Sequence, residues 1–423
     1  MRILHVTQRY LPALGGSEAL VAGLATRLVQ RGHSVTIATT DALDFALFWE
    51  PQARRISLHQ ETIDDVRVLR FPVRHLPLSR YAYPGLRRLL WLLTRNNWVP
   101  TAWLHRISKF TPYVPDLFRW LATTDEEFDV VVGTTIVFES LVQAARLYAR
   151  RKQRPFVVFP LTHLGAGPAP GADPVSAFYT MRHQVDLVRS ATFVVGMTPT
   201  EATFYTRRGV PGDAVAVAGP GITPDELLGG NPDRLRERLQ IREPLVGVLS
   251  SLSVDKGSIH LLEAVRRLRK QGEDIQLVMG GAITPAFQRY WDRLSTEERR
   301  GIHLLGAVDE QTKRDFLAAI DVFAMPSRTD SFGIVYLEAW LYGKPVIGAQ
   351  AWGMADMIRH GEDGFLVPFG DVAALAQAIH TLLRDPALAA RLGAQGRRKT
   401  LAQHTWDDKV ERIEQIYTRL AGV

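Results

Sequence analysis

Short apolar runs alternate along this chain with segments in which apolar residues recur at helical spacing. The first run, RILHVT at 2–7, is followed by a helical pattern over 17–30 and then by a second run, HSVTIATT at 33–40. Arg31 and Gly32 end the helical pattern with a cation and a glycine stop, as helices commonly end. A strand, a helix and a strand in this order form a βαβ unit, whose two strands are parallel because a crossover joins them.

The alternation occurs in two series. Further strands of the first series are predicted at 129–133, 155–160, 191–196 and 214–219, and those of the second at 245–250, 275–280, 302–306, 321–326 and 344–348. The stretch GPGITPDELLGGNPD at 219–233 separates them and is typical of a linker. The sequence therefore predicts an α/β protein with two doubly wound, Rossmann-like domains. Such sheets bind ligands beyond the carboxyl ends of their strands, so the expected site is the cleft between the domains.

The length of 423 residues agrees with two domains, because a single core rarely grows so large. We assign residues 1–218 to an N-terminal domain and 219–400 to a C-terminal domain. Residues 401–423 are predicted to form a helix that crosses back to brace the first domain.

The composition excludes several classes of protein. Apolar residues make up 46% of the chain and charged residues 22%, which is typical of a globular protein. The absence of cysteine removes disulfides, thiolate metal sites and cysteine nucleophiles. No run approaches the roughly 18 apolar residues that cross a bilayer, and the first residues become polar too early for a secretory signal. We expect a cytoplasmic protein, or one docked on the cytoplasmic face of a membrane.

The positive charge is concentrated in the first domain. Up to Val217 there are 25 basic and 17 acidic residues, whereas the remainder has 26 and 27, which together give the net charge of +7. Residues 66–120 hold ten basic residues, ten aromatic residues and one acid, Asp116. This basic, aromatic insert predicts contact with an anionic partner.

Within the insert, the leucines at 86, 89, 90 and 93 are predicted to line one helical face, with Arg87, Arg88 and Arg95 away from it. Such a helix can lie in the interface of an anionic membrane. The alternative is a helix packed on the first domain with its arginines in water. Nucleic acid is not expected, since no recognised binding motif accompanies the charge.

Two glycine-containing turns are candidates for binding phosphate. Gly15 and Gly16 precede the first helix, where a missing side chain lets backbone amides approach an anion. Lys256 and Gly257 lie between a strand and a helix, which places an ammonium group at a helix N-terminus. The alternatives are a plain turn and a solvated surface lysine.

The stretch PSRTDSFGIVYLEAWLYGKPVIG at 326–348 holds two carboxylates, Asp330 and Glu338. A helix is predicted to begin near Phe332 and Gly333, and the amides of its first turn can donate to a diphosphate. Glu338 lies one turn further along and can accept two hydroxyl hydrogens, as a ribose diol requires. The alternative is that Asp330 or Ser331 only caps the helix.

His163 follows the strand at 155–160 and precedes a glycine-rich loop, LGAG. A lone histidine is more often structural than catalytic, but this one stands at the carboxyl end of a strand. Other catalytic motifs are absent: the sequence has no D-x-D pair for a metal, no H-E-x-x-H, no G-x-S-x-G and no Walker A motif. No metal and no cofactor are therefore expected.

Together and in this order, these motifs resemble the retaining glycosyltransferases of the GT-B fold called group 1, or family 4. The resemblance covers nearly the whole chain, from GGSE at 15–18 through TPTEATFYTRRGVP to GMADMIRHGEDGFLVPFGD. Its most specific part is the stretch at 326–348, which corresponds to the E-x7-E motif of that family. The resemblance implies transfer of a hexosyl group from a UDP-, GDP- or ADP-linked sugar to a hydroxyl of a glycan, a glycolipid or a lipid-linked precursor.

The resemblance also implies roles for the candidate residues. Lys256 and the amides at 331–334 would neutralise the departing diphosphate, Glu338 would hold the ribose, Asp330 would contact the donor sugar, and His163 would stand beside the reacting sugar. The implied catalytic residues are His163 and Asp330. The implied donor-binding residues are Gly15, Gly16, Lys256, Ser331, Phe332, Gly333, Ile334 and Glu338.

Two departures from the family pattern leave alternatives open. Asp330 stands where the family usually has glutamate, which is longer by one C–C bond, about 1.5 Å. Ser250, Ser251 and Leu252 stand where the family commonly reads G-R-L, so the arginine that would accompany Lys256 is missing. The alternatives are a catalytically weakened nucleotide-sugar-binding subunit and a GT-B epimerase acting on UDP-N-acetylglucosamine.

Overall fold

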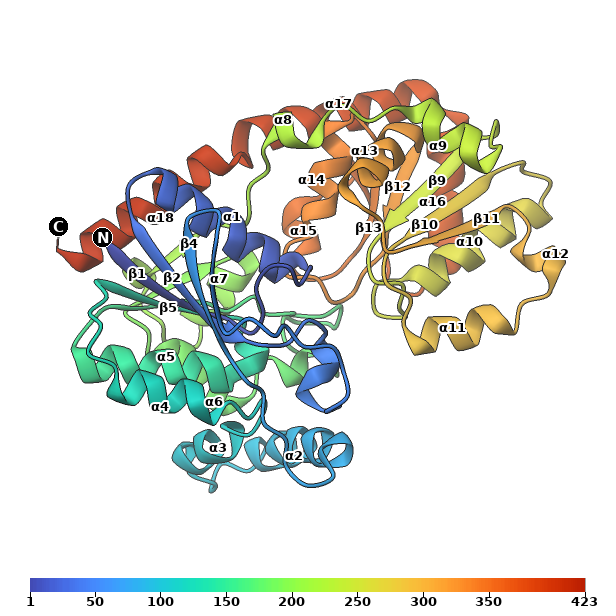
Figure 1. Cartoon of the computed structure of the whole chain (residues 1–423). Coiled ribbons are helices and arrows are strands. Elements are labelled where there is room, and N and C mark those ends of the chain that lie inside the picture. Colours follow the sequence, from blue (N-terminus) through green and yellow to red (C-terminus); the bar gives the residue numbers. More distant parts are fainter. Residues whose placement is uncertain (423) are drawn as a thin grey trace. The chain divides into compact units, whose positions relative to one another are not determined.

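The computed structural model describes residues 1–422 and contains two compact units, each built around one β-sheet (Figure 1). Unit 1 comprises residues 1–163, 171–220 and 406–422, and unit 2 comprises residues 164–170 and 221–405. Each sheet is covered by helices, as expected for Rossmann-like domains. The predicted fold class is confirmed.

The sheet of unit 1 has eight strands in the order β3-β4-β2-β1-β5-β6-β7-β8. All neighbours are parallel except β3, which is antiparallel to β4. In the central strand, Ile3 pairs with Val35 on one side and Val130 on the other. The strands are β1 Arg2–Val6, β2 Ser34–Thr40, β3 Gln60–Ile63, β4 Val66–Phe71, β5 Val130–Thr134, β6 Phe156–Phe159, β7 Phe193–Gly196 and β8 Val215–Val217.

Helices cover both faces of this sheet (Figure 1). The helices α1 and α18 lie on one face, α4 and α5 lie on the other, and α2 and α3 form a further layer outside α5 and α6. The helices are α1 Gly16–Gln30, α2 Ser79–Thr94, α3 Thr101–Ser108, α4 Pro115–Thr123, α5 Glu139–Lys152, α6 Arg182–Arg189, α7 Pro199–Thr206 and α18 Trp406–Ala421, with 3-10 turns at Phe45–Phe48, Ile136–Phe138, Ser176–Phe178 and Gly212–Ala214.

The last helix, α18, packs against α1 within unit 1. Its first residue, Trp406, lies so close to Gly23 that a Cβ atom at Gly23 would stand 2.3 Å from the indole. Near its end, Glu414 accepts hydrogen bonds from Arg31 and His33, each at 2.6 Å. The chain therefore returns to the first sheet after completing the second.

The sheet of unit 2 has six parallel strands in the order β11-β10-β9-β12-β13-β14. Parallel crossovers are right-handed, so helices that lead in opposite directions along the sheet cover opposite faces. The strands are β9 Leu245–Leu249, β10 Gln276–Gly280, β11 Ile302–Gly306, β12 Val322–Met325, β13 Val346–Ala349 and β14 Gly364–Val367.

The helices of unit 2 pack in pairs, α10 with α16 and α14 with α17. The short segment 164–170 also belongs to this unit, where the carbonyls of Gly165 and Gly167 accept hydrogen bonds from Trp352. The helices are α8 Pro224–Leu227, α9 Pro232–Leu239, α10 Ser258–Lys270, α11 Pro285–Asp292, α12 Thr296–Arg299, α13 Glu310–Ala319, α14 Ile334–Leu341, α15 Met354–Met357, α16 Val372–Arg384 and α17 Pro386–Gln403.

The predicted faces of the insert helix are wrong at Arg87 and Leu89, whereas Leu90 is buried and Arg88 and Arg95 are exposed, as in a helix packed on the first domain. Arg87 is buried and donates to both carboxylate oxygens of Glu139, whereas Leu89 and Leu92 are exposed. The physical reason is that Glu139 is fully buried, and a buried carboxylate requires a cation. α2 therefore faces inward with Arg87 and Leu90, and its outer face carries leucines. Among residues 1–422, none of the helices has the length and apolar character needed to cross a bilayer.

Candidate functional site

The loop after β9 holds Lys256 against the end of β12. Gly257 ends this loop with a φ of +73°, a conformation that favours glycine. A Cβ atom at Gly257 would lie 2.3 Å from the carbonyl oxygen of Pro326, so the two loops can approach only because this residue has no side chain. The loop is also held by Asp255, whose Oδ1 accepts hydrogen bonds from Arg328 at 2.7 and 2.9 Å.

The predicted site residues Lys256 and Asp330 lie together. Lys256 Nζ is 2.6 Å from Asp330 Oδ2, and each side chain keeps about one fifth of its surface exposed. The N-cap residue of α14 is Gly333, which has no side chain, so neither Asp330 nor Ser331 occupies the N-cap position. Asp330 pairs with Lys256, the cation expected at the phosphate.

The N-cap residue of α14 is a glycine, so the start of this helix presents backbone groups. Gly333 has a φ of +80°, and a Cβ atom there would lie 2.6 Å from the ring of Tyr336. Phe332 is buried, with its ring edge-on to His404 at 5.8 Å between centroids, so its side chain serves packing. Ser331 and Ile334 are half-buried. The positive end of the α14 dipole lies beside the Lys256–Asp330 pair, a combination that favours an anionic ligand.

Glu338 lies one turn into α14 and is 7% exposed. Burial raises the pKa of its carboxyl group, although Lys313 Nζ, at 3.2 Å, acts in the opposite direction. Burial alone would lower the pKa of Lys313, but Glu338 and Glu310 raise it. Sequence analysis missed Lys313, because a lysine on α13 carries no motif and only the fold places it beside Glu338.

The position of the missing arginine is exposed. Ser251 follows β9 and has its side chain at the surface, whereas Ser250 and Leu252 are less accessible. The structure places another cation, Arg328, on the loop that carries Asp330, and its guanidinium stacks over Phe369 at 5.1 Å. Arg328 was not identified from the sequence, because nothing in its spacing separates it from a surface arginine.

In unit 1, Gly15 and Gly16 begin α1. A Cβ atom at Gly15 would lie 2.3 Å from Glu18 Oε2, whereas one at Gly16 would meet nothing within 4 Å. Glu18 is buried and accepts hydrogen bonds from Arg9 Nε at 2.8 Å and from Ser17 Oγ at 2.8 Å. Gly15 is therefore explained by packing against Glu18, and only Gly16 faces open space that a ligand could enter.

His163 also lies in unit 1, four residues beyond β6. Its ring stacks on Tyr179, with 4.4 Å between centroids and 12° between planes. The preceding residue, Thr162, is fixed by Glu201, which accepts from its amide at 2.5 Å, and by the hydroxyl of Tyr205 at 2.7 Å. Burial raises the pKa of Glu201 although the amides of Met197 and Thr162 oppose this. The TPTE pattern at 198–201 suggests only a helix cap, so the role of Glu201 was not identified.

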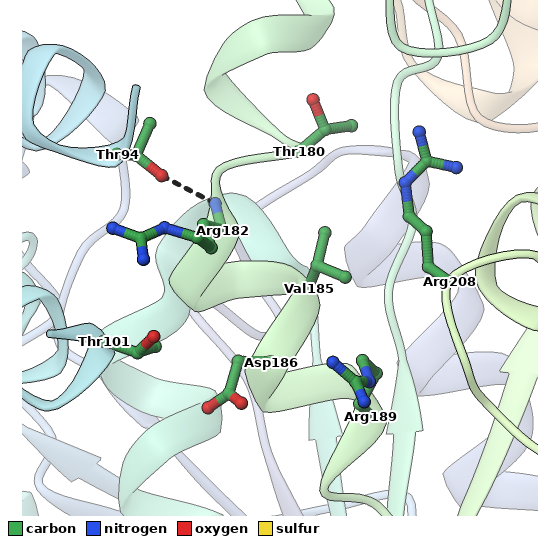
Figure 2. A pocket seen from close by; sticks show the side chains of 8 residues that line it. All are labelled: Thr94, Thr101, Thr180, Arg182, Val185, Asp186, Arg189 and Arg208. Carbon is green, nitrogen blue, oxygen red and sulfur yellow. Dashed lines mark hydrogen bonds between the residues drawn. The ribbon is translucent and has the colours of Figure 1, made fainter. Parts of the chain in front are cut away.

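The candidate residues thus fall into two groups. Unit 2 brings together Lys256, Asp330, the start of α14 and Glu338, and unit 1 carries Gly15, Gly16 and His163. Across residues 1–422, no group of three or more His, Asp or Glu side chains is placed to hold a metal ion. A cavity of about 530 Å³ in unit 1 is lined by none of the candidate residues (Figure 2).

Two family models match the chain, one in each unit. A model described as "Glycosyl transferase 4-like domain" matches residues 15–221, and one described as "Glycosyl transferases group 1" matches residues 232–399. The two matched segments follow one another along the sequence and contain every candidate site residue.

Curated relatives match about half of the chain. A GDP-mannose-dependent alpha-(1-6)-phosphatidylinositol monomannoside mannosyltransferase of Mycolicibacterium smegmatis is 32% identical over 49% of this chain and 56% of its own length. A D-inositol 3-phosphate glycosyltransferase of Xylanimonas cellulosilytica is 30% identical over 55% of this chain and 58% of its own. The matched segment spans little more than half the length of these relatives.

Solved structures match the whole chain in fold. Anabaena HepE in complex with UDP and glucose has a TM-score of 0.72 at 20% identity, covering 99% of this chain and all of that chain. Sucrose-phosphate synthase from Thermosynechococcus elongatus has a TM-score of 0.71 at 21% identity, covering 99% and 98%. At this identity the likeness concerns the fold, which is GT-B.

Proposed function

Because this chain belongs to the group 1 glycosyltransferases, also called family 4, we propose that it transfers a hexosyl group from a nucleotide-diphosphate sugar to a hydroxyl acceptor. We propose further that transfer retains the anomeric configuration and needs no metal ion. The donor carries uridine, guanosine or adenosine, and the acceptor is a glycan, a glycolipid or a lipid-linked precursor. The GDP-mannose and UDP named for the relatives make these two nucleotides the first to be tested.

The observation that carries this proposal is the arrangement around Lys256. Its ammonium group lies 2.6 Å from Asp330, on the loop that leads into α14, whose N-cap residue is Gly333. A cation and a helix N-terminus both attract a diphosphate. Negative charge that develops on a departing nucleoside diphosphate would be stabilised there, and such stabilisation is usually the largest part of catalysis.

The same arrangement suggests an order of events for unit 2. A donor diphosphate competes with the Asp330 carboxylate, because both are anions that would contact the single ammonium group of Lys256. Once the diphosphate takes Lys256, the Asp330 carboxylate is released to accept hydrogen bonds from hydroxyls of the donor sugar. The leaving phosphate then helps to deprotonate the acceptor hydroxyl on the face from which it departs.

Glu338 and His163 complete the proposed site. Glu338 binds the ribose diol, with Lys313 holding its carboxylate in place at 3.2 Å. His163 lies beside the reacting sugar, with its ring orientation fixed by the stack on Tyr179. Gly16, which has open space where a side chain would be, leaves room for the donor phosphates.

A thermal-shift panel of nucleotide-sugars tests the proposal, because a ligand that binds the folded protein raises its melting temperature by mass action. We expect at least one donor to raise the melting temperature, and Lys256→Ala to remove that shift. Lys270→Ala, at the exposed far end of the helix that follows Lys256, is the matched control and should keep the shift. No shift with any nucleotide-sugar would contradict the proposal.

Measurement of turnover distinguishes the proposed transfer from the two alternative functions. Transfer to an acceptor supports the proposal. Donor binding without turnover on any acceptor would indicate a weakened subunit, which the exposed Ser251 in the usual arginine position makes a specific alternative. Release of UDP from UDP-N-acetylglucosamine without transfer would indicate an epimerase.

We also propose that the insert at 66–120 contacts an anionic membrane surface. Its outer face exposes large apolar side chains at 37–80% of their surface: Leu78, Tyr81, Leu89, Leu92, Trp98, Trp103 and Phe110. Arg80, Arg88, Arg95 and Arg106 are exposed on the same helices and loop. The single acid, Asp116, is already paired with Arg74 and Arg119. Apolar side chains interleaved with cations are typical of interfacial contact.

Flotation with vesicles tests this contact independently of catalysis. The wild-type protein should float with vesicles that contain phosphatidylglycerol and remain in solution with phosphatidylcholine alone. Added salt should weaken binding, since the attraction falls off within a Debye length. Absence of flotation at low salt would contradict the membrane contact and leave the transferase proposal unaffected.

A further inference from the structure

A polar groove lies at the base of the insert, and none of the candidate residues of the transferase site lines it. It occupies about 530 Å³ in unit 1. Figure 2 shows its lining: Thr94 and Thr101 come from the ends of α2 and α3, and Arg182, Asp186 and Arg189 come from α6. Arg208, which follows α7, lines it as well.

The groove has an excess of positive charge. Three arginines line it with a single carboxylate, that of Asp186. This carboxylate is already used: Asp186 Oδ2 lies 3.0 Å from His105 Nε2 and 4.0 Å from Arg146. The hydrogen bond from His105 lowers the pKa of Asp186, and the charges of Arg146 and Arg189 lower it further. This single carboxylate is therefore shared among several cations, and the lining keeps an excess of positive charge.

Two of the arginines form no ion pair within 4 Å among the described residues 1–422. Arg189 is close enough to Asp186 for its charge to lower the pKa of that carboxyl group, but it does not form a contact pair with it. Arg208 donates only to the carbonyl of Phe204 and stacks over that ring at 3.5 Å. Partial burial lowers the pKa of Arg208, which means that the cation is held at a cost without an anion beside it. An anionic ligand would remove this cost.

The remaining polar groups of the groove are suited to a phosphate. Thr94 Oγ1 accepts a hydrogen bond from the amide of Arg182 at 2.7 Å, which leaves its hydroxyl hydrogen to be donated. The Arg182 guanidinium holds the carbonyls of Asn96 and Val99, and its buried Nε has no protein partner. Guanidinium and hydroxyl donors together are the usual partners of phosphate oxygens.

The position of the groove indicates where that phosphate comes from. Arg182 fixes the loop that carries Trp98, which is 79% exposed, and Trp103, at 61%, lies two residues beyond Thr101. Tryptophan is favoured where apolar chains meet water, because its ring is apolar and its N–H is polar. The two most exposed tryptophans of the insert thus lie within four residues, along the chain, of the lining threonines Thr94 and Thr101.

We propose that this groove binds the phosphate of an anionic phospholipid headgroup, with Trp98 and Trp103 entering the interfacial layer beside it. The inference rests on the proposed membrane contact of the insert and is independent of the nucleotide-sugar site. It adds a defined headgroup site to a contact that the exposed side chains alone would leave unspecific. The alternative ligand is a soluble phosphate compound, which would make the same contacts to the groove without any lipid.

The test compares two double variants of the full chain by vesicle flotation. Arg189→Ala with Arg208→Ala removes the two unpaired cations of the groove. Arg150→Ala with Arg207→Ala removes two exposed cations of the same unit that do not line it. Each cation near a membrane contributes about 1 kcal/mol, so the groove variant should bind phosphatidylglycerol vesicles at least about tenfold more weakly than the wild type. The control should change by less than about threefold.

Further measurements identify the source of the phosphate and test whether the effect is specific to the groove. Inorganic phosphate should displace the wild type from vesicles more effectively than chloride at equal ionic strength. The melting temperature and the nucleotide response of the groove variant should match the wild type, which shows that it is folded. Equal flotation of the two double variants would overturn the groove and leave the membrane contact standing. A phosphate-induced rise in melting temperature with no binding to vesicles would overturn the lipid assignment.

Discussion

Two ion pairs connect the candidate residues of unit 2, Lys256 with Asp330 and Lys313 with Glu338. Each joins a residue singled out in the sequence to a cation on another element. If the donor diphosphate binds Lys256 as proposed, it displaces the Asp330 carboxylate, so donor affinity depends on the difference between the two contacts. The shorter carboxylate of Asp330 is thereby explained locally: it reaches Lys256 at 2.6 Å from its own loop.

At the same scale, we predict that His163→Ala lowers kcat with little effect on donor affinity. The ring is half-buried and fixed against Tyr179, which suits a group that orients a sugar. Loss of one hydrogen bond in the transition state, worth about 0.5–1.5 kcal/mol, corresponds to a fall of up to about tenfold. Steady-state kinetics and calorimetry of donor binding measure the two effects, with the exposed His59→Ala as control. Unchanged kcat would remove His163 from the site.

Glu201 gives a prediction about pH. Its pKa is raised by burial above the usual 4.5, so the folded state binds its proton more strongly than the unfolded state. The free energy of unfolding that this carboxyl contributes is therefore largest below pH 4.5 and falls as the pH rises through the folded-state pKa. Glu201→Gln cannot titrate, so its stability relative to the wild type should increase as the pH is raised from 4.5 to 7.

Urea denaturation of both proteins across this pH range measures that difference. The lost hydrogen bonds to Met197 and Thr162 add a constant offset, so the slope with pH is the quantity to compare. The exposed Glu411→Gln serves as control. If the difference in stability between Glu201→Gln and the wild type does not vary with pH, the pKa of Glu201 is not raised by burial.

At the scale of secondary-structure elements, the insert helix α2 is held by a buried ion pair. Arg87 Nη1 lies 2.6 Å from Glu139 Oε1, with 9% and 0% of the side chains exposed. Burial alone would raise the pKa of Glu139, but Arg87 and His183 hold it below its usual value. This pair fixes α2 on the start of α5, with Leu89 and Leu92 on its exposed face.

We predict that Arg87→Ala lowers the free energy of unfolding by about 3–5 kcal/mol, because it leaves Glu139 charged and buried. The neighbouring Arg88 is exposed, and Arg88→Ala should change stability by less than about 0.5 kcal/mol. Chemical denaturation of the two variants provides the comparison. Similar stabilities would show that the pair does not hold the helix.

A second element-scale prediction concerns the contact between α1 and α18. Alanine at Gly23 would favour the helix by about 1 kcal/mol, but its Cβ would stand 2.3 Å from Trp406. Overpacking of this kind costs about 1–3 kcal/mol, so Gly23→Ala should be destabilising on balance. Gly212→Ala, where a Cβ would meet nothing within 4 Å, is the control. The melting temperatures of the two variants measure this effect. A Gly23→Ala protein that is more stable than the wild type would contradict the close packing of Gly23 against Trp406.

At the scale of the whole molecule, we predict that nucleotide protects a local part of unit 2. If the diphosphate binds at Lys256 and α14, hydrogen exchange should slow in the loop 250–257 and in the first turn of α14. At a nucleotide concentration of one hundred times Kd, stabilisation is about 2.7 kcal/mol. Mass spectrometry of peptides from α16, which carries no candidate residue, provides the internal reference. Protection spread evenly over unit 2 would contradict a local site.

The two units were predictable because their signals are local. The apolar positions of α1 at 20, 21, 24, 25 and 28 are all buried, as their spacing predicted. β14 was not predicted, because GFLV at 364–367 is short and follows a loop without a clear helix before it. β3 and β4 were not predicted either, since half of their residues are polar, and β4 lies within the segment assigned to the insert.

Sequence alone determined the order of strands and helices, the two sheets, and the loops that carry Lys256, Asp330 and Glu338, because periodicity and glycine positions act over a few residues. Only the tertiary structure decided which charges meet. The partners of Lys256, Glu338 and Arg87 lie 74, 25 and 52 residues away. A buried charge selects its partner by position in space, and that position exists only once the sheets have formed.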